Sequence, residues 1–122
     1  MTQTSTTYVI LLPGDESAWE AATEDERTAV YALHEEFSAA LEARGHKITG
    51  GLELGPSREA RTLRTAADGS MTVTDGPYAE TAEQLSGFYV VESTDLDDLI
   101  DVCRILGRDE GAIEVRATAV EP

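Results

Sequence analysis

Two short apolar runs constrain the fold of this chain more than any other feature. They occupy residues 8–12 and 87–91, and both have the length of a strand without the alternation of a half-exposed one. A strand that is apolar on both sides is usually covered on both faces. The two runs are therefore expected to lie near the centre of one sheet.

A helix is expected after the first run, from Thr23 to about Arg44. Thr23 and Glu26 form a capping box at its start, and Gly45 stops it. Apolar residues recur along it at spacings of three and four, which predicts one face packed on a sheet. A short helical turn at residues 15–22 precedes it. The apolar residues of the long helix are Val30, Leu33, Phe37 and Leu41.

A second helix is expected after the second run, capped by residues 93–95 and ended by Gly107. Residues 113–119 then alternate between apolar and polar side chains, which predicts a strand with one buried face. The apolar stripe of this second helix comprises Leu96, Leu99, Ile100, Cys103 and Leu106.

Between the two helices the chain is expected to be extended. Residues 47–54 form a strand in which Gly50 and Gly51 predict a bulge or a close backbone approach. Residues 60–66 and 70–74 are joined through an Asp-Gly pair, which is a strong hairpin signal.

This order of elements predicts an α+β fold, a ferredoxin-like sandwich with an extra β-hairpin after the second strand. In that fold both helices cover one face of the sheet, yet the two apolar runs point large side chains both ways. A second copy of the chain is the economical cover for the other face, which predicts a homodimer through the open face of the sheet. Residues 8–120 are expected to form a single domain after a flexible or disordered N-terminus at residues 1–7.

The charge of the chain narrows its partners. Nine Lys and Arg stand against 24 Asp and Glu, a net charge of −15. So acidic a surface repels phosphate backbones and anionic lipids, so neither nucleic acid nor a membrane is expected as a partner. No apolar run approaches the ~20 residues that span a bilayer. Without a signal peptide at its start, the chain is expected to be cytoplasmic.

Few side chains are candidates for chemistry. Cys103, the single cysteine, lies on an apolar stripe and is expected to be a small buried hydrophobe. His34 lies at the edge of a helix face, where a packing role and an acid/base role both stay open. His46, near a helix end, is expected to be solvated. Two histidines do not make a metal cage, and the sequence has no phosphate loop or dinucleotide fingerprint, so neither a metal nor a cofactor is expected.

The densest run of special residues lies at residues 74–81, after the hairpin. Gly76 and Pro77 predict a rigid turn that would hold Asp75 and Tyr78 in set directions. Because Asp, Gly and Pro are ordinary turn formers, the turn is either only a corner or a device that presents side chains.

These segments give the chain a resemblance to a known family. The motif DGPYAET at residues 75–81 is followed by EQL at 83–85 and GFY at 87–89, with ALHEEF at 32–37 and AIEVR at 112–116. In this order they resemble the YCII-related family, and within it the branch named for its Asp-Gly-Pro-Phe motif. Tyr78 stands where that motif usually has phenylalanine, and Ala82 where the branch usually has lysine.

The resemblance implies a ferredoxin-like fold of the dimeric α+β barrel type and a candidate site built from His34 and Asp75. Asp75 would orient the imidazole, and His34 would move a substrate proton. Some YCII-like proteins are implicated in hydrolytic or dehalogenating steps on small aromatic or lactone-like molecules, and most have no assigned reaction.

Two hypotheses of function follow. The first is a small enzyme without a cofactor, in which His34 and Asp75 act on a small organic substrate. Its aromatic pocket wall would comprise Trp19, Tyr78 and Tyr89. The alternative is a non-catalytic small-molecule-binding or regulatory module, because relatives in this branch often stand beside, or are joined to, alternative sigma factors.

Overall fold

The computed structural model describes residues 4–119 of the 122-residue chain. The predictions for residues 1–3 and for residue 120 lie outside the described residues. The elements are β1 (Thr6–Asp15), α1 (Glu16–Ala21), α2 (Glu24–Ala43), β2 (Lys47–Glu53), η1 (Ser57–Glu59), β3 (Arg61–Thr65), β4 (Met71–Asp75), β5 (Glu83–Ser93), α3 (Leu96–Cys103), η2 (Leu106–Arg108) and β6 (Glu114–Ala117).

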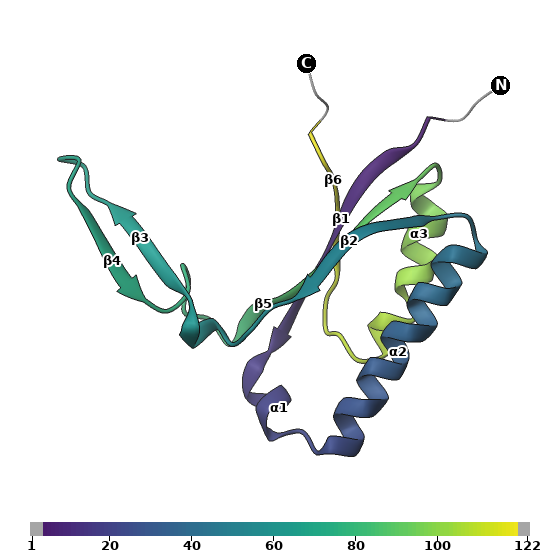
Figure 1. Cartoon of the computed structure of the whole chain (residues 1–122), viewed down its shortest axis with the longest axis horizontal. Helices are drawn as coiled ribbons and strands as arrows, with labels where there is room; N and C mark the ends of the chain where they lie inside the picture. The colour runs from purple at the N-terminus through teal and green to yellow at the C-terminus, as the bar shows by residue number, and fades with distance from the viewer. Residues whose placement is uncertain (1–3, 120–122) are drawn as a thin grey trace.

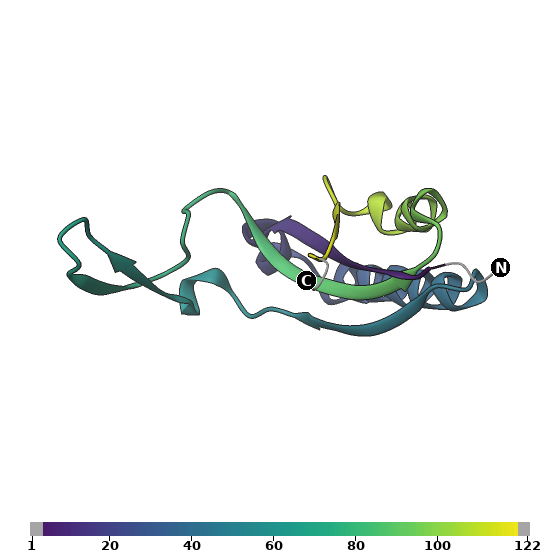
Figure 2. The same ribbon diagram turned by 90° about the horizontal axis from the view of Figure 1, so that it is seen from above.

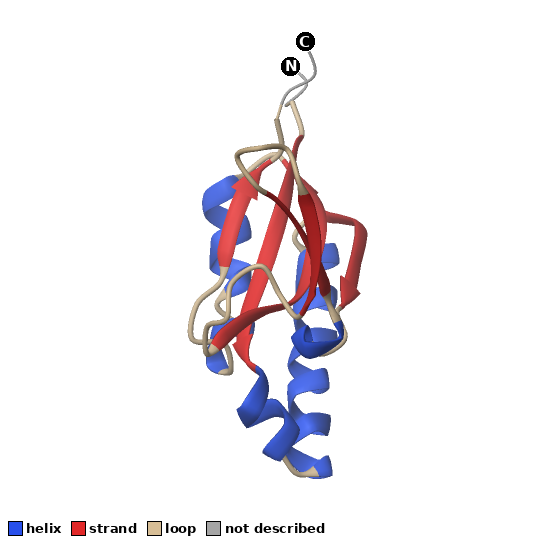
Figure 3. Ribbon diagram, turned by 90° about the vertical axis from the view of Figure 1, so that its left-hand side faces the viewer, coloured by secondary structure: helices blue, strands red, loops and turns tan. Residues whose placement is uncertain are grey.

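Four strands form an antiparallel sheet in the order β2-β5-β1-β6. The two apolar runs are its central strands, β1 and β5, as their lack of alternation predicts. Helices α2 and α3 lie on the same face of this sheet (Figure 1, Figure 3). The architecture is α+β and consistent with a ferredoxin-like fold.

The core lies between that sheet face and the two helices. The capping box at the start of α2 is present: the Thr23 hydroxyl accepts from the amide of Glu26, and the Glu26 carboxylate accepts from the amide of Thr23. The helix ends as predicted, because Gly45 follows it with a φ of 83°. The buried core side chains are Ile10, Leu12, Phe37, Leu41, Val91, Leu99, Val102, Cys103 and Leu106.

The stripe predicted for α3 is partly wrong. Leu96 and Ile100 are 39% and 43% exposed, whereas Val102, absent from the predicted stripe, is buried. At about 100° of rotation per residue, the buried side chains of α3 (Leu99, Val102 and Cys103) lie within a sector of about 100°. Ile100 lies well outside this sector, and Leu96 lies just beside it in the first turn of the helix. The face of α3 that packs against the core is therefore narrower than the spacing of its apolar residues predicts.

The opposite face of the sheet carries a second set of apolar side chains. The register pairs Val9 with Val90, and places Leu11, Phe88 and Leu52 side by side across three strands. Opposed residues in neighbouring strands point to the same face. Helices α2 and α3 lie on the other side of the sheet. We call the sheet face that carries Val9, Leu11, Leu52, Phe88 and Val90 the open face.

The hairpin β3–β4 stands apart from the sheet. Its two strands pair only with each other, in a separate two-stranded sheet. Figures 1 and 2 show it extending away from the body of the domain, on a long connection between β2 and β5. We call residues 55–82 the β3–β4 arm.

Candidate functional site

His34 lies on α2 and faces the sheet. Its Nδ1 is 2.7 Å from the hydroxyl oxygen of Tyr89, which projects from the central strand β5. The two rings are stacked, with centroids 5.9 Å apart and planes 28° from parallel. Phe37, about one turn further along α2, also packs against Tyr89, with ring centroids 5.2 Å apart. The contact thus joins the middle of the long helix to the middle of the sheet.

The surroundings of this pair favour its neutral forms. Burial lowers the pKa of His34 below its ordinary value, while the negative charges of Asp109 and Glu53 act in the opposite direction. Burial also raises the pKa of the Tyr89 phenol. At neutral pH a neutral imidazole therefore faces a protonated phenol, and the two share one hydrogen bond in either direction.

The Glu53 carboxylate is held near this pair by a residue that the sequence did not single out. The Tyr31 hydroxyl donates to the two carboxylate oxygens of Glu53, at 3.0 and 3.1 Å. Tyr31 in turn meets the Trp19 ring edge-on, with centroids 5.6 Å apart. Because Tyr31 precedes His34 by three residues on α2, helical spacing could have placed it on the same side of the helix.

Asp75 lies elsewhere, at the end of β4. Its side chain is 89% exposed, and its ion-pair partner is Arg61, 3.8 Å away on the paired strand. Within residues 4–119 of a single chain, no hydrogen bond or ion pair joins Asp75 to His34. The structure of one chain therefore separates the two residues that the resemblance places in one site.

The turn after Asp75 is a firm structural feature. Gly76 is buried, with a φ of 104°, a conformation that favours glycine. Its amide donates to the Ala60 carbonyl at 2.7 Å, and its carbonyl accepts from the Thr62 hydroxyl at 2.8 Å. The turn thus closes the base of the arm. Beside it is an open pocket whose lining includes Asp75 and Arg58.

The three aromatic residues proposed as a pocket wall have different neighbours. Tyr89 contacts His34, and Trp19 contacts Tyr31 together with the Arg27 guanidinium, which lies 5.3 Å from its ring centre. Tyr78 is on the arm, where it is 82% exposed and Arg64 lies 5.8 Å from its ring centre. Only Tyr89 contacts the candidate histidine.

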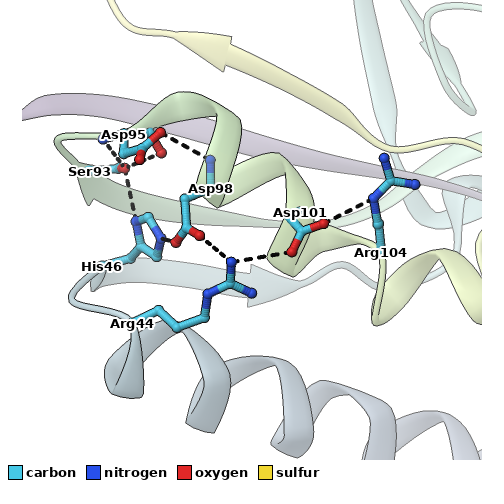
Figure 4. Close-up of polar contacts among 7 residues, drawn as sticks. All are labelled: Arg44, His46, Ser93, Asp95, Asp98, Asp101 and Arg104. Carbon is cyan, nitrogen blue, oxygen red and sulfur yellow. Dashed lines mark hydrogen bonds and ion pairs between the residues drawn. The ribbon is translucent and has the colours of Figure 1, made fainter.

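The expectation that His46 is solvated is wrong. His46 is 6% exposed, with Nδ1 2.8 Å from the Ser93 hydroxyl and Nε2 2.7 Å from the Asp98 carboxylate. Figure 4 shows this network, which the Arg44 guanidinium extends to Asp98 and Asp101. Position near a helix end does not decide exposure here, because β5 and α3 fold over the chain that follows α2.

The Ser93–His46–Asp98 contacts resemble a hydrolase triad in residue types but not in access. Ser93 is 2% exposed, and its hydroxyl oxygen is also bonded to the amide and carbonyl of Asp95. A nucleophile must reach a substrate, and this serine oxygen is enclosed by its own chain. The network therefore joins the end of α2 to β5 and to the start of α3.

Two further groups have shifted pKa values. Cys103 is buried, as the sequence predicts, and its burial raises the pKa of the thiol to about 11. Burial, with the charge of Asp109, raises the pKa of Glu110 to about 7.

Within residues 4–119, no three His, Cys, Asp or Glu side chains are grouped so as to hold a metal ion. None of the helices in this range combines the length and apolar character needed to cross a bilayer.

Fold and site together define an α+β domain of ferredoxin-like topology with a half-buried histidine against its sheet. The chain matches the YCII-related domain over residues 6–117. It is also 37% identical, over 121 residues, to an uncharacterised protein of Rhizobium meliloti (strain 1021), with 93% of this chain and 92% of that protein covered. The chain belongs to the YCII-related family, so this part of the resemblance is confirmed.

Proposed function

We propose that the chain is a small enzyme without a cofactor, in which His34 transfers a proton to or from a small organic substrate. The observation that carries this proposal is the 2.7 Å contact between His34 Nδ1 and the Tyr89 hydroxyl, made by a half-buried imidazole. An imidazole with a lowered pKa keeps a lone pair at neutral pH, which a general base requires.

The two ring nitrogens of His34 divide the work. The Tyr89 hydroxyl contacts Nδ1 and sets the orientation of the ring. In the tautomer in which Nδ1 carries the hydrogen and donates it to the Tyr89 oxygen, the lone pair is on Nε2. Nε2 makes no hydrogen bond within residues 4–119, so in this proposal it is the atom that exchanges a proton with the substrate. A carboxylate near an imidazole favours its protonated form, so Glu53 and Asp109 would stabilise the cation that forms when Nε2 accepts a proton.

Asp75 enters this proposal through a second copy of the chain. Its exposed carboxylate cannot orient His34 of the same chain, so the paired role needs the arm of a neighbour. A homodimer through the open face is supported by the uncovered apolar side chains there, above all Leu52, which is 68% exposed. Burying Val9, Val90 and their neighbours would supply the hydrophobic contribution that such a contact needs.

A non-catalytic binding or regulatory module remains the second candidate. The observation that favours it is the open pocket beside Asp75, which is lined by arm residues and by Gln84 of β5 and does not include His34. A site of that kind would recognise a ligand without the candidate histidine beside it.

The test is a thermal-shift screen of small aromatic and lactone-like compounds, followed by a measurement of whether each stabilising compound is consumed. We expect consumption by the wild type and a loss of at least about a hundredfold in kcat for His34→Gln. Arg104→Gln, at an exposed ion pair, is the control and should retain full activity. Full activity of His34→Gln would contradict the catalytic proposal, and recovery of every ligand unchanged would favour the binding module.

A further inference from the structure

The β3–β4 arm is attached to the body only at its base. There the Ser57 amide donates to the Glu16 carboxylate at 2.7 Å, and Arg58 pairs with Glu20. Every hydrogen bond and ion pair found for residues 61–75 has its partner within residues 60–78. The outer part of the arm therefore has no support from the body of its own chain.

One face of the arm is apolar. The register pairs Leu63 with Val73 and Thr65 with Met71, so these side chains share a face, while Thr62, Thr72 and their neighbours form the other. Leu63, Met71 and Val73 are 60%, 63% and 62% exposed. A two-stranded hairpin is marginally stable alone in water and needs packing on a further surface.

The position of the arm favours a second copy as its partner. The arm leaves the body on the side of the sheet opposite to α2 and α3, the side on which the open face also lies (Figure 1). The open face and the apolar face of the arm are thus both uncovered on the same side of the molecule. In a two-fold dimer, each of these surfaces on one copy can pack against the other copy, and every contact occurs twice.

Charge supports the same partner. The arm holds three arginines and four acids, a net charge of −1, whereas the rest of the chain carries −14 of the total −15. The arm can thus approach an acidic copy with much less repulsion than the rest of the chain taken as a whole. Its arginines, Arg61 among them, would be attracted to the acidic body.

We propose that the β3–β4 arm is a dimerisation arm, whose apolar face of Leu63, Met71 and Val73 docks on the body of a second copy of this chain. The proposal rests on the homodimer inferred above and extends it to a second contact. Each arm also brings its Asp75 turn to the partner, which gives that residue a route to a site it does not reach within its own chain.

The test compares two adjacent residues of β4 on opposite faces. Val73→Asp and Thr72→Asp add the same charge to the same strand, and dimer dissociation is measured by sedimentation equilibrium over a range of concentrations. We expect Val73→Asp to raise the dimer Kd by at least about tenfold, and Thr72→Asp to leave it within about twofold. Equal dimer dissociation constants for the two variants and the wild type overturn the proposal. A monomeric wild type also overturns it, even if the arm binds another protein.

Amide hydrogen exchange provides a measurement that does not depend on a variant's folding. Amides of residues 61–75 should be protected when wild-type protein is concentrated and lose protection on dilution below the dimer Kd. Exchange in the arm that is independent of concentration overturns the proposal. Val90→Asp, on the open face, tests the contact between the sheets separately. The turnover of His34→Gln tests the catalytic proposal. The arm contact, the sheet contact and the catalytic role of His34 can therefore each fail without the other two.

Discussion

The Nδ1 atom of His34 lies 2.7 Å from the hydroxyl oxygen of Tyr89, and the two rings are nearly parallel. This contact joins α2 to the central strand β5 and is the only polar contact of the His34 ring within residues 4–119. It makes Tyr89, a residue expected from the sequence to line a pocket, the direct partner of the candidate proton-transfer group.

Tyr89→Phe removes the hydroxyl and keeps the ring. We expect a loss of about 1 kcal/mol in the free energy of unfolding, because one half-buried hydrogen bond is lost while the packing on Phe37 stays. Loss of the hydroxyl, the partner of Nδ1, should also change the tautomer populations of His34. The imidazole 15N shifts of His34 measure these populations. The chain has only two histidines, so His46 serves as the internal reference. An unchanged His34 spectrum would show that the hydroxyl does not orient the ring.

His34 should make the fold sensitive to mild acid. Its pKa is lowered in the folded state, so its contribution is present above the ordinary pKa of 6.5 and is lost as pH falls through the folded pKa. In His34→Gln this part of the acid sensitivity should be absent. Urea unfolding of both proteins between about pH 7 and pH 5 measures it. The same slope in both would contradict the assignment.

Glu110 should make the stability of the fold depend on pH in the opposite sense to His34. Its pKa of about 7 lies above the ordinary value of 4.5, so stability falls as pH rises through about 7. We expect Glu110→Gln to be more stable than the wild type by about 1–2 kcal/mol at pH 8, after allowance for solvent screening, and equal to it at pH 4. Chemical unfolding at the two pH values checks this. A stabilisation that is the same at both would assign the effect to packing.

The buried His46 network should contribute strongly to stability. His46→Phe keeps a ring but removes the bonds to Ser93 and Asp98, so we expect a loss of about 2 kcal/mol or more. Arg104→Gln, which removes an exposed ion pair from the same region, should cost less than about 0.5 kcal/mol. Thermal unfolding of the two variants compares them. Equal effects would mean that the network is no stronger than a surface pair.

The two adjacent glycines of β2 offer a matched test of the close approach to β5. A Cβ on Gly51 would lie 2.6 Å from the Phe88 carbonyl oxygen, and Gly51 has a φ of 149°. Gly51→Ala should therefore destabilise the fold by about 2 kcal/mol or more. Gly50→Ala meets only the Val90 side chain, at 3.7 Å, and should cost less than about 1 kcal/mol. Similar melting temperatures for the two variants would contradict the close approach.

Local patterns predicted most of the fold. The capping box at Thr23, the stop at Gly45 and the close backbone approach at Gly51 were all found where spacing and residue type placed them. Each depends on a few neighbouring residues, whose conformational preferences are similar in any context. The error in α3 arose where a helix has more apolar residues than the core covers, because sequence cannot tell which of them the neighbouring elements reach.

The candidate site was less predictable than the fold. His34 was placed correctly at the edge of the α2 face, but Tyr31 and Glu53 were missed. Their positions depend on how α2 meets the end of β2, a contact between segments about 20 residues apart. His46 was misjudged for the same reason, since β5 and α3 enclose it from 47 and 52 residues away.

The sequence by itself determined the order of strands and helices, the central place of the two apolar runs, the rigid turn at Gly76 and the family. These follow from periodicity and from backbone preferences, which act over a few residues. The tertiary structure alone decided that His34 meets Tyr89, that His46 is buried and that Asp75 stands apart on an extended arm. Those outcomes depend on which side chains the packing of distant segments brings within a few ångströms, and no local preference encodes that distance.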